Sequence, residues 1–152
     1  YTADNIAGAR NDTYAMCGGG NDNTQRLKKV VAFNDSLVKT ELSTGLTNKS
    51  TGNRGIYFNH QAIFAGGADG TTYRANVDAF DNSLVKTQLA DLGVARQYLA
   101  GGANENFAIF ANVVGAGRNK NYYKIDGSEA SINEEKNVRI IDSAFYSFFK
   151  AK

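Results

Sequence analysis

Cysteine and histidine are nearly absent from this sequence, which contains one of each. A single cysteine, Cys17, excludes a disulfide within the chain. A single histidine, His60, excludes metal sites and catalytic centres that need several imidazoles. Proline and tryptophan are missing altogether. No apolar run approaches the roughly 18 residues that a spanning helix needs, so we expect no membrane span.

The sequence also has little excess of one charge over the other, because 17 basic and 15 acidic residues leave a net charge of +2. So small an excess does not favour nucleic acid as a partner. What is abundant is glycine, with 16 residues, and asparagine, with 17. Both tolerate positive φ in tight turns, so the composition is typical of many short strands joined by sharp turns. We expect one domain over residues 1–152, in which 127–152 fit the pattern least.

Thirteen residues occur nearly twice, as Val30–Leu42 and Val77–Leu89, with nine identical positions and an offset of 47 residues. Each copy begins with strand-like alternation, which places Val77 and Ala79 on one side and the two residues between and after them on the other. Turn formers and a second apolar segment follow. Each copy therefore predicts a β-hairpin that serves as scaffold.

A second motif recurs with the same period. Apolar segments of strand length centre on Ala15, Ala62 and Ala108, and the first two end in glycines that permit a sharp reversal. Another short strand is expected before each, at 5–8, 55–58 and 97–101. Four strands in about 47 residues is the size of one propeller blade.

A third copy is expected near the end of the chain. Tyr122–Ser128 falls where the next hairpin begins, and Phe145–Phe149 resembles the strand at 106–110. Between them, Glu129–Lys136 is polar enough for a short helix or a loop. The sequence thus predicts an all-β fold of about three four-stranded units.

These units resemble kelch repeats, a β-propeller family. Kelch blades combine a strand ending in Gly-Gly, an apolar-x-apolar-aromatic-Asp strand and a later Arg, which correspond here to Ile63–Gly67, Val77–Asp81 and Arg96. The tryptophan usual on the fourth kelch strand is replaced by Leu37 and Leu84. The Trp-free units look more like the kelch-like arrays of bacterial or phage surface proteins. The resemblance implies kelch-like propeller blades.

The number of units bears on how such a fold closes. Closed propellers typically have four to eight blades, and an open stack exposes strand edges. About three units therefore close a ring only with other copies or as part of a longer chain. We prefer assembly of several copies, and so expect a homo-oligomer.

Individual reactive residues favour structural roles. His60 lies in a turn and is expected to be a solvated loop residue. Cys17 takes the place of Phe64 and Phe110 in the other copies, which predicts a buried apolar position. Gly18–Gly20 is not followed by the Gly-Lys-Ser/Thr of a phosphate loop, and the Asn- and Asp-rich loops do not fit a calcium loop. We therefore expect no catalytic residues, no metal site and no cofactor.

Loops at which the copies differ are the better candidates for binding, because rigid scaffolds present functional residues on loops. Asparagine and aspartate read sugar hydroxyls, and tyrosine stacks on sugar rings. The predicted ligand-binding residues are Asn21, Asp22, Asn23, Asp69, Tyr73, Arg118, Asn119 and Tyr122.

The sequence leaves three hypotheses for function open. The first is a non-enzymatic binding or attachment module that recognises a cell-surface glycan or protein in multiple copies. The second is a structural, self-assembling component of a surface layer, fibre or virion. The third is a fragment of a larger propeller enzyme. The first two place the protein outside the cell, on a cell surface or in a virion.

Overall fold

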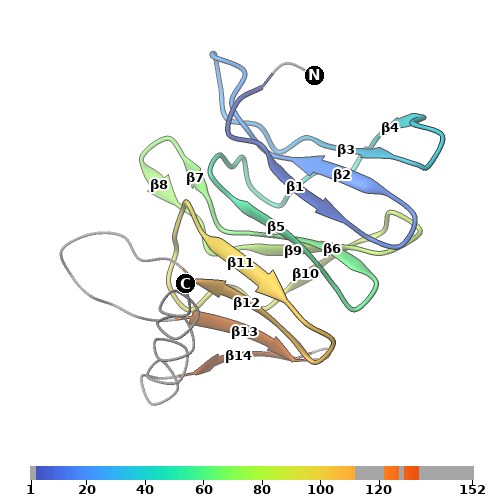
Figure 1. Ribbon diagram of the computed structural model, residues 1–152. Helices are drawn as coiled ribbons and strands as arrows, with labels where there is room; N and C mark the ends of the chain where they lie inside the picture. The colour runs from blue at the N-terminus through green and yellow to red at the C-terminus, as the bar shows by residue number, and fades with distance from the viewer. Residues whose placement is uncertain (1–2, 112–121, 127–128, 134–152) are drawn as a thin grey trace, which may run out of the picture.

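The computed structural model describes residues 3–111, 122–126 and 129–133, which form fourteen β-strands and no helix. None of these residues therefore belongs to a helix able to span a membrane. The expectation of an all-β chain is confirmed for this part (Figure 1). The strands are β1 (Ala7–Arg10), β2 (Ala15–Gly18), β3 (Val30–Phe33), β4 (Lys39–Glu41), β5 (Arg54–Phe58), β6 (Gln61–Ala65), β7 (Ala68–Asp69), β8 (Thr72–Tyr73), β9 (Val77–Phe80), β10 (Lys86–Leu89), β11 (Ala100–Ala103), β12 (Phe107–Ala111), β13 (Tyr122–Asp126) and β14 (Glu129–Asn133).

Twelve of the strands form three antiparallel four-stranded sheets. The first sheet has the order β1-β2-β3-β4, the second β5-β6-β9-β10 and the third β11-β12-β13-β14, while β7 and β8 form a separate hairpin. The first strands begin at Ala7, Arg54 and Ala100, with the spacing of the sequence repeat. Each repeat unit therefore folds into one sheet of neighbouring strands.

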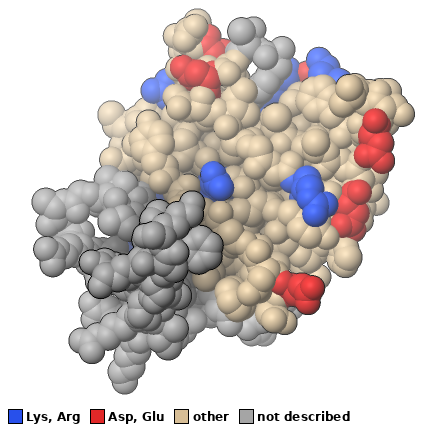
Figure 2. Space-filling model, in the orientation of Figure 1, with Lys and Arg blue, Asp and Glu red and all other residues tan. Residues whose placement is uncertain are grey.

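The sheets are stacked so that their first strands meet. β5 packs against both β1 and β11, and all three lie side by side in Figure 1. Small residues allow this approach, because a Cβ atom added at Gly55 would overlap the carbonyl oxygen of Gly8 on β1. Figure 2 shows the same side of the molecule as largely uncharged, with isolated basic and acidic side chains.

Two hydrophobic clusters hold the stack together, one between each pair of adjacent sheets. Met16 and Phe80 belong to the cluster between the first and second sheets, and Ile63 and Phe110 to the cluster between the second and third. The alternation expected for β9 is confirmed, since Val77 and Ala79 enter one cluster and Phe80 the other. All four β9 residues are buried because the second sheet is covered on both faces.

The turn of the repeated hairpin explains part of its repeated sequence. The side-chain oxygen of Asp81 accepts hydrogen bonds from the backbone N–H groups of Ser83 and Val85, and Asn34 does the same one repeat earlier. This Asx turn carries the chain through a left-handed residue, Leu37 or Leu84, with φ near 60°. The second strand of the later copy consequently starts after this turn, at Lys86.

Other predicted boundaries shift as well. The predicted first strands at 5–8 and 97–101 lie at Ala7–Arg10 and Ala100–Ala103. The prediction of a helix or loop at Glu129–Lys136 was wrong over residues 129–133, which form β14. The strand does alternate, with Ala130 and Ile132 between polar residues, but five residues inside a longer polar stretch are too few to reveal the period. The predicted strand at 145–149 lies outside the described residues.

Candidate functional site

The sheets present two ends with different chemistry. At the glycine end, β2 and β6 terminate in Gly19–Gly20 and Gly66–Gly67, all with positive φ, and the chain reverses sharply as predicted. At the opposite turn end lie the hairpin turns after β1, β3, β5 and β9. The described loops that carry predicted binding residues, β2–β3 and β6–β9, both leave the sheets at the glycine end.

The β2–β3 loop is held by its own polar groups. Asn21 forms isolated β-bridges with Asp4 and Arg26. One carboxylate oxygen of Asp22 accepts bonds from the hydroxyl and N–H of Thr24 and from a second backbone N–H. The Thr24 hydroxyl contributes most to lowering the pKa of Asp22. Asn23 adopts φ 73°, which asparagine tolerates. The contacts that the structure gives these three predicted residues therefore serve to shape the loop.

The β6–β9 connection contains the short β7–β8 hairpin. Asp69 accepts a hydrogen bond at 3.1 Å from the guanidinium of Arg74, which anchors the hairpin to the strand that follows. Tyr73 remains 54% exposed. Asp69 thus serves as an anchor, whereas the Tyr73 ring is open to a ligand.

A polar hollow lies between the first and second sheets at the glycine end. It is a shallow depression of about 220 Å³ that includes open solvent, and its sheltered part, about 10 Å³, has room for about one water-sized group. Its lining combines three asparagines, a serine, an arginine and an aspartate with a small apolar floor. The lining residues are Asn48, Asn53, Asn76, Ser50, Arg74, Asp78, Leu46, Phe64 and Gly66.

Two polar atoms in this hollow are buried and have no hydrogen-bond partner among the described residues. They are Oδ1 of Asn53 and Nε of Arg74. Burying a polar atom without a partner costs about 1–3 kcal/mol, so such atoms point to a bound group or water. One is an acceptor and the other a donor, and hydroxyl groups can serve either of them.

The other lining groups are already engaged. The amide nitrogen of Asn48 donates to Oδ1 of Asn76, and the hydroxyl of Ser50 donates to the carbonyl of Gly66 at 2.8 Å. Asp78, only 3% exposed, accepts bonds from the N–H and hydroxyl of Thr47. These bonds fix the walls of the hollow.

Both predicted loops are connected to the hollow. The β2–β3 loop begins at Gly19, where an added Cβ atom would lie 2.9 Å from Oδ1 of Asn53. The β7–β8 hairpin is tied to the hollow by the Asp69–Arg74 pair. Sequence reasoning found the loops but missed the asparagines of the hollow, which come from inter-strand segments outside the duplicated hairpin.

A second polar cluster, at the turn end, also escaped sequence reasoning. Asp12 accepts hydrogen bonds from the hydroxyl of Tyr57 at 2.8 Å and the amide of Asn82 at 3.0 Å, and it contacts Nδ1 of His60 at 2.7 Å. His60 is exposed in the β5–β6 turn, as predicted, yet it has this acidic partner. The cluster joins the first sheet to the second.

The electrostatics of this cluster favour an ionised Asp12. The hydrogen bond from Asn82 contributes most, followed by that from Tyr57, and together with His60 they lower the pKa of Asp12 from 3.8 to about 2. The guanidinium of Arg10 lies 4.0 Å from the centre of the Tyr57 ring. All the polar groups of Asp12 have partners, so we assign the cluster a structural role as a clamp.

The structure does not place the remaining predicted binding residues at the hollow. Arg118 and Asn119 lie outside the described residues. Tyr122 is the first residue of β13. The prediction of a buried Cys17 was wrong, because the residue is half-buried, on a face of the first sheet that none of the described sheets covers. No group of three or more metal-ligating side chains occurs in the part of the chain that the structure describes.

The sequence matches no protein-family model and no curated protein. A solved structure, that of YjhT, is similar to this chain with a TM-score of 0.69 at 14% sequence identity. The likeness covers 88% of this chain and 46% of that one, so the chain spans less than half the length of that protein. Since identity is low, the comparison shows that this stacked-sheet fold recurs within a longer chain, and it shows the fold alone.

Proposed function

We propose that this chain is part of a kelch-like β-propeller and acts as a non-enzymatic binding or attachment module. Its three sheets are the blades, and the polar hollow at the glycine end binds a cell-surface glycan. Stacked four-stranded sheets with adjacent first strands support the propeller assignment. The recurrence of the Gly-Gly reversal supports the kelch-like character.

The observation that carries the proposed function is the unpartnered pair in the hollow, Oδ1 of Asn53 and Nε of Arg74. A sugar hydroxyl can donate to the first of these atoms or accept from the second, because it is both a donor and an acceptor. The exposed ring of Tyr73, next to Arg74 in sequence, offers a surface on which a sugar ring can stack. Acceptor, donor and aromatic face together match the chemistry of a carbohydrate.

We propose that the hollow binds a ligand rather than catalyses a reaction, because its one carboxylate, that of Asp78, is already engaged. Asp78 accepts two bonds from Thr47 and lies 3.7 Å from the ammonium of Lys86. A carboxylate held in this way secures the connection between two sheets instead of meeting a substrate. Presentation in several copies adds avidity to weak single sites, which suits attachment at a cell surface or on a virion.

Two variants and one matched control test the site. Asn53→Ala removes the unpartnered acceptor, and Tyr73→Ala removes the stacking ring. Asn106→Ala deletes the same amide at the turn end, where its side chain has no assigned role. A glycan array identifies the ligand, and calorimetry then compares the variants. We expect Asn53→Ala to weaken binding about tenfold or more, in line with the 1–3 kcal/mol of an unsatisfied polar group, and Asn106→Ala to leave it unchanged.

Two results would overturn this proposal. If Asn53→Ala and Tyr73→Ala bind the array ligand as the wild type does, the hollow is not the site. If no glycan on the array binds, a protein ligand or a purely structural, self-assembling role becomes the better account.

A further inference from the structure

Adjacent sheets pack in one repeated way, which defines two faces of a sheet. The forward face contacts the following sheet, and the rear face contacts the preceding one. Between the first and second sheets, the forward face contributes Met16, Val30 and Ala32, and the rear face contributes Phe64 and Phe80. The two phenylalanine rings meet edge to face at 6.0 Å.

The second interface uses the same positions one repeat later. The forward face of the second sheet contributes Ile63, Val77 and Ala79, and the rear face of the third contributes Ala108 and Phe110. Phe110 corresponds to the first of the two rear-face phenylalanines of the second sheet. One geometric relation therefore generates both interfaces.

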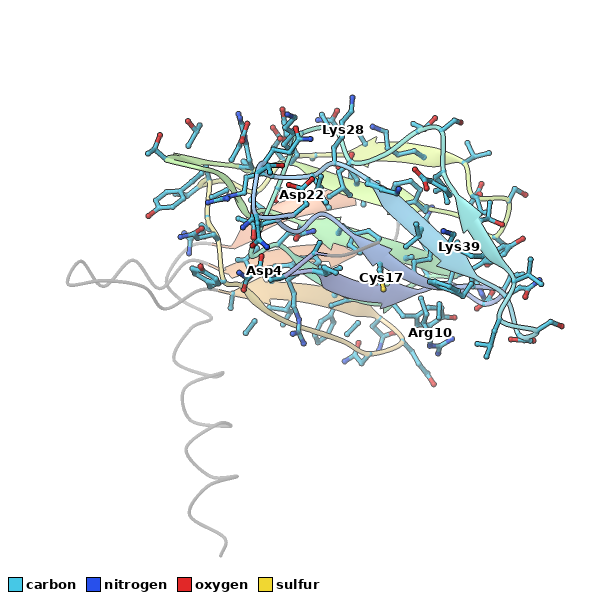
Figure 3. The ribbon with its side chains drawn as sticks, turned by 90° about the horizontal axis from the view of Figure 1, so that it is seen from above. Asp4, Arg10, Cys17, Asp22, Lys28 and Lys39 are labelled. Atoms are coloured by element: carbon cyan, nitrogen blue, oxygen red, sulfur yellow. The ribbon has the colours of Figure 1, made fainter. Side chains whose placement is uncertain are left out.

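The rear face of the first sheet has a similar apolar centre, but none of the sheets formed by residues 3–111, 122–126 and 129–133 covers it. Cys17 and Phe33 take the positions of Phe64 and Phe80, and both are half-buried. Val31 lies between them and is buried. Figure 3 looks onto the first sheet as the uppermost layer, with Cys17 in view. An apolar sheet face of this kind is built to be covered.

A recurring glycine tells what covers this face. Gly8, Gly55 and Gly101 occupy matching positions on the three first strands. A Cβ atom at Gly55 would overlap the carbonyl of Gly8, and one at Gly101 would lie 3.0 Å from the side chain of Ile56, so both positions receive the preceding first strand closely. Around a Cβ atom at Gly8 there is nothing within 4 Å. Gly8 thus matches two positions that lie against a first strand, but no described first strand lies against Gly8 itself.

We propose that a second copy of this chain covers that face. The forward face of the third sheet of one copy docks on the rear face of the first sheet of the other, and two such contacts close a ring of six sheets. A head-to-tail contact closes a ring when its rotation permits, and six lies within the four to eight blades of closed propellers. The solved structure that this chain covers to 46% of its length has room for two such units.

The chemistry of the docking faces fits this occupant. On the forward face of the third sheet, Phe107, Ile109 and Ala111 are half-buried, and Ile109 corresponds to Met16 and Ile63 of the filled interfaces. Docking brings these side chains onto the apolar centre of the rear face. It also supplies a first strand that packs beside β1, as β5 does on the other side within one copy.

This inference rests on the propeller arrangement proposed above but not on the glycan. Association and ligand binding have separate measurements, so failure of one is distinguishable from failure of the other. A protein that binds the glycan as a monomer refutes the ring and leaves the site intact. A dimer that binds no glycan does the reverse.

The test uses two single-methyl substitutions in the 152-residue chain. Gly8→Ala places a Cβ atom where the incoming first strand must approach, although that Cβ atom meets nothing in the single copy. Gly102→Ala is the matched control. Its Cβ atom also meets nothing, and the corresponding position in the second sheet carries a side chain, that of Ile56. Sedimentation equilibrium should give twice 16.4 kDa for the wild type and for Gly102→Ala. Gly8→Ala should weaken association about tenfold or more.

Thiol labelling provides an independent measurement. Cys17 lies at the centre of the proposed contact, so maleimide should react slowly with wild-type protein at high concentration and rapidly with Gly8→Ala. Circular dichroism of both variants confirms that they keep the fold. A wild-type monomer at every concentration, a filament or ring of another size, or equal association of Gly8→Ala and Gly102→Ala would each overturn the proposal.

Discussion

The internal repeat supplies its own control for a stability experiment. Phe80 and Phe33 end the same Val-x-Ala-Phe strand in consecutive sheets, yet Phe80 is fully buried beside Phe64 and Phe33 is half-buried. Phe80→Ala and Phe33→Ala therefore delete the same atoms from the same local backbone. They differ in whether a neighbouring sheet covers the ring.

The expected losses follow from that difference. A fully buried Phe→Ala costs about 3–5 kcal/mol, which includes the cavity it leaves. Phe33 is less completely buried, so we expect a smaller loss, about 2–4 kcal/mol. At about 2–4 °C per kcal/mol for a chain of this size, Phe80→Ala should lower Tm by roughly 6–20 °C and Phe33→Ala by less, roughly 4–16 °C.

Urea unfolding followed by circular dichroism measures both variants. The experiment is done in the Gly8→Ala background, so that a second copy does not cover Phe33. Equal losses in free energy of unfolding would refute the reasoning, because they would mean that sheet stacking does not bury Phe80 more than Phe33.

Three further predictions concern the clamp, the glycines and the turns. Because the folded pKa of Asp12 is about 2, below its ordinary 3.8, its stabilising contribution is complete above about pH 4 and lost as the pH falls toward 2. The urea midpoint should therefore fall less steeply between about pH 5 and pH 2.5 in Asp12→Asn than in the wild type. An unchanged pH dependence of the midpoint would contradict the clamp. Gly55→Ala should cost about 1–3 kcal/mol by overlap with Gly8, and a neutral urea midpoint would contradict that packing. Asp81→Ala removes two turn hydrogen bonds and should cost about 1–2 kcal/mol in the same assay; Ser83→Ala, whose side chain makes no described bond, is the control.

Local features of the fold were predictable from the sequence. The duplicated segment gave both hairpins, because its alternation and its turn formers act over a few residues. The Gly-Gly reversals were equally clear, since Gly19 and Gly66 need φ values that other residues resist. β14 was missed because its alternation, with Ala130 and Ile132 between polar residues, covers only five residues of a polar stretch.

The sites depend on distant residues, and for that reason the sequence concealed them. Asp12 meets Tyr57 and Asn82 across 45 and 70 residues. The unpartnered atoms of Asn53 and Arg74 belong to segments before two different strands. No periodicity marks such pairs, because each arises only when two sheets stack. The sequence predicted loops at the glycine end but not the hollow between them, and that these loops bind a ligand stays a prediction.

The unequal coverage of the sheets has a consequence for motion. Each sheet is built from strands that are close in sequence, so its hydrogen bonds form without the rest of the chain. The second sheet is packed on both faces, whereas the first is packed on one. Amide protons of β6 and β9 should therefore exchange with solvent only on global unfolding, and those of β2 and β3 through a cheaper partial opening. The second sheet is then the most rigid part of the chain. Whatever covers the first sheet sets how fast β2 and β3 open to solvent.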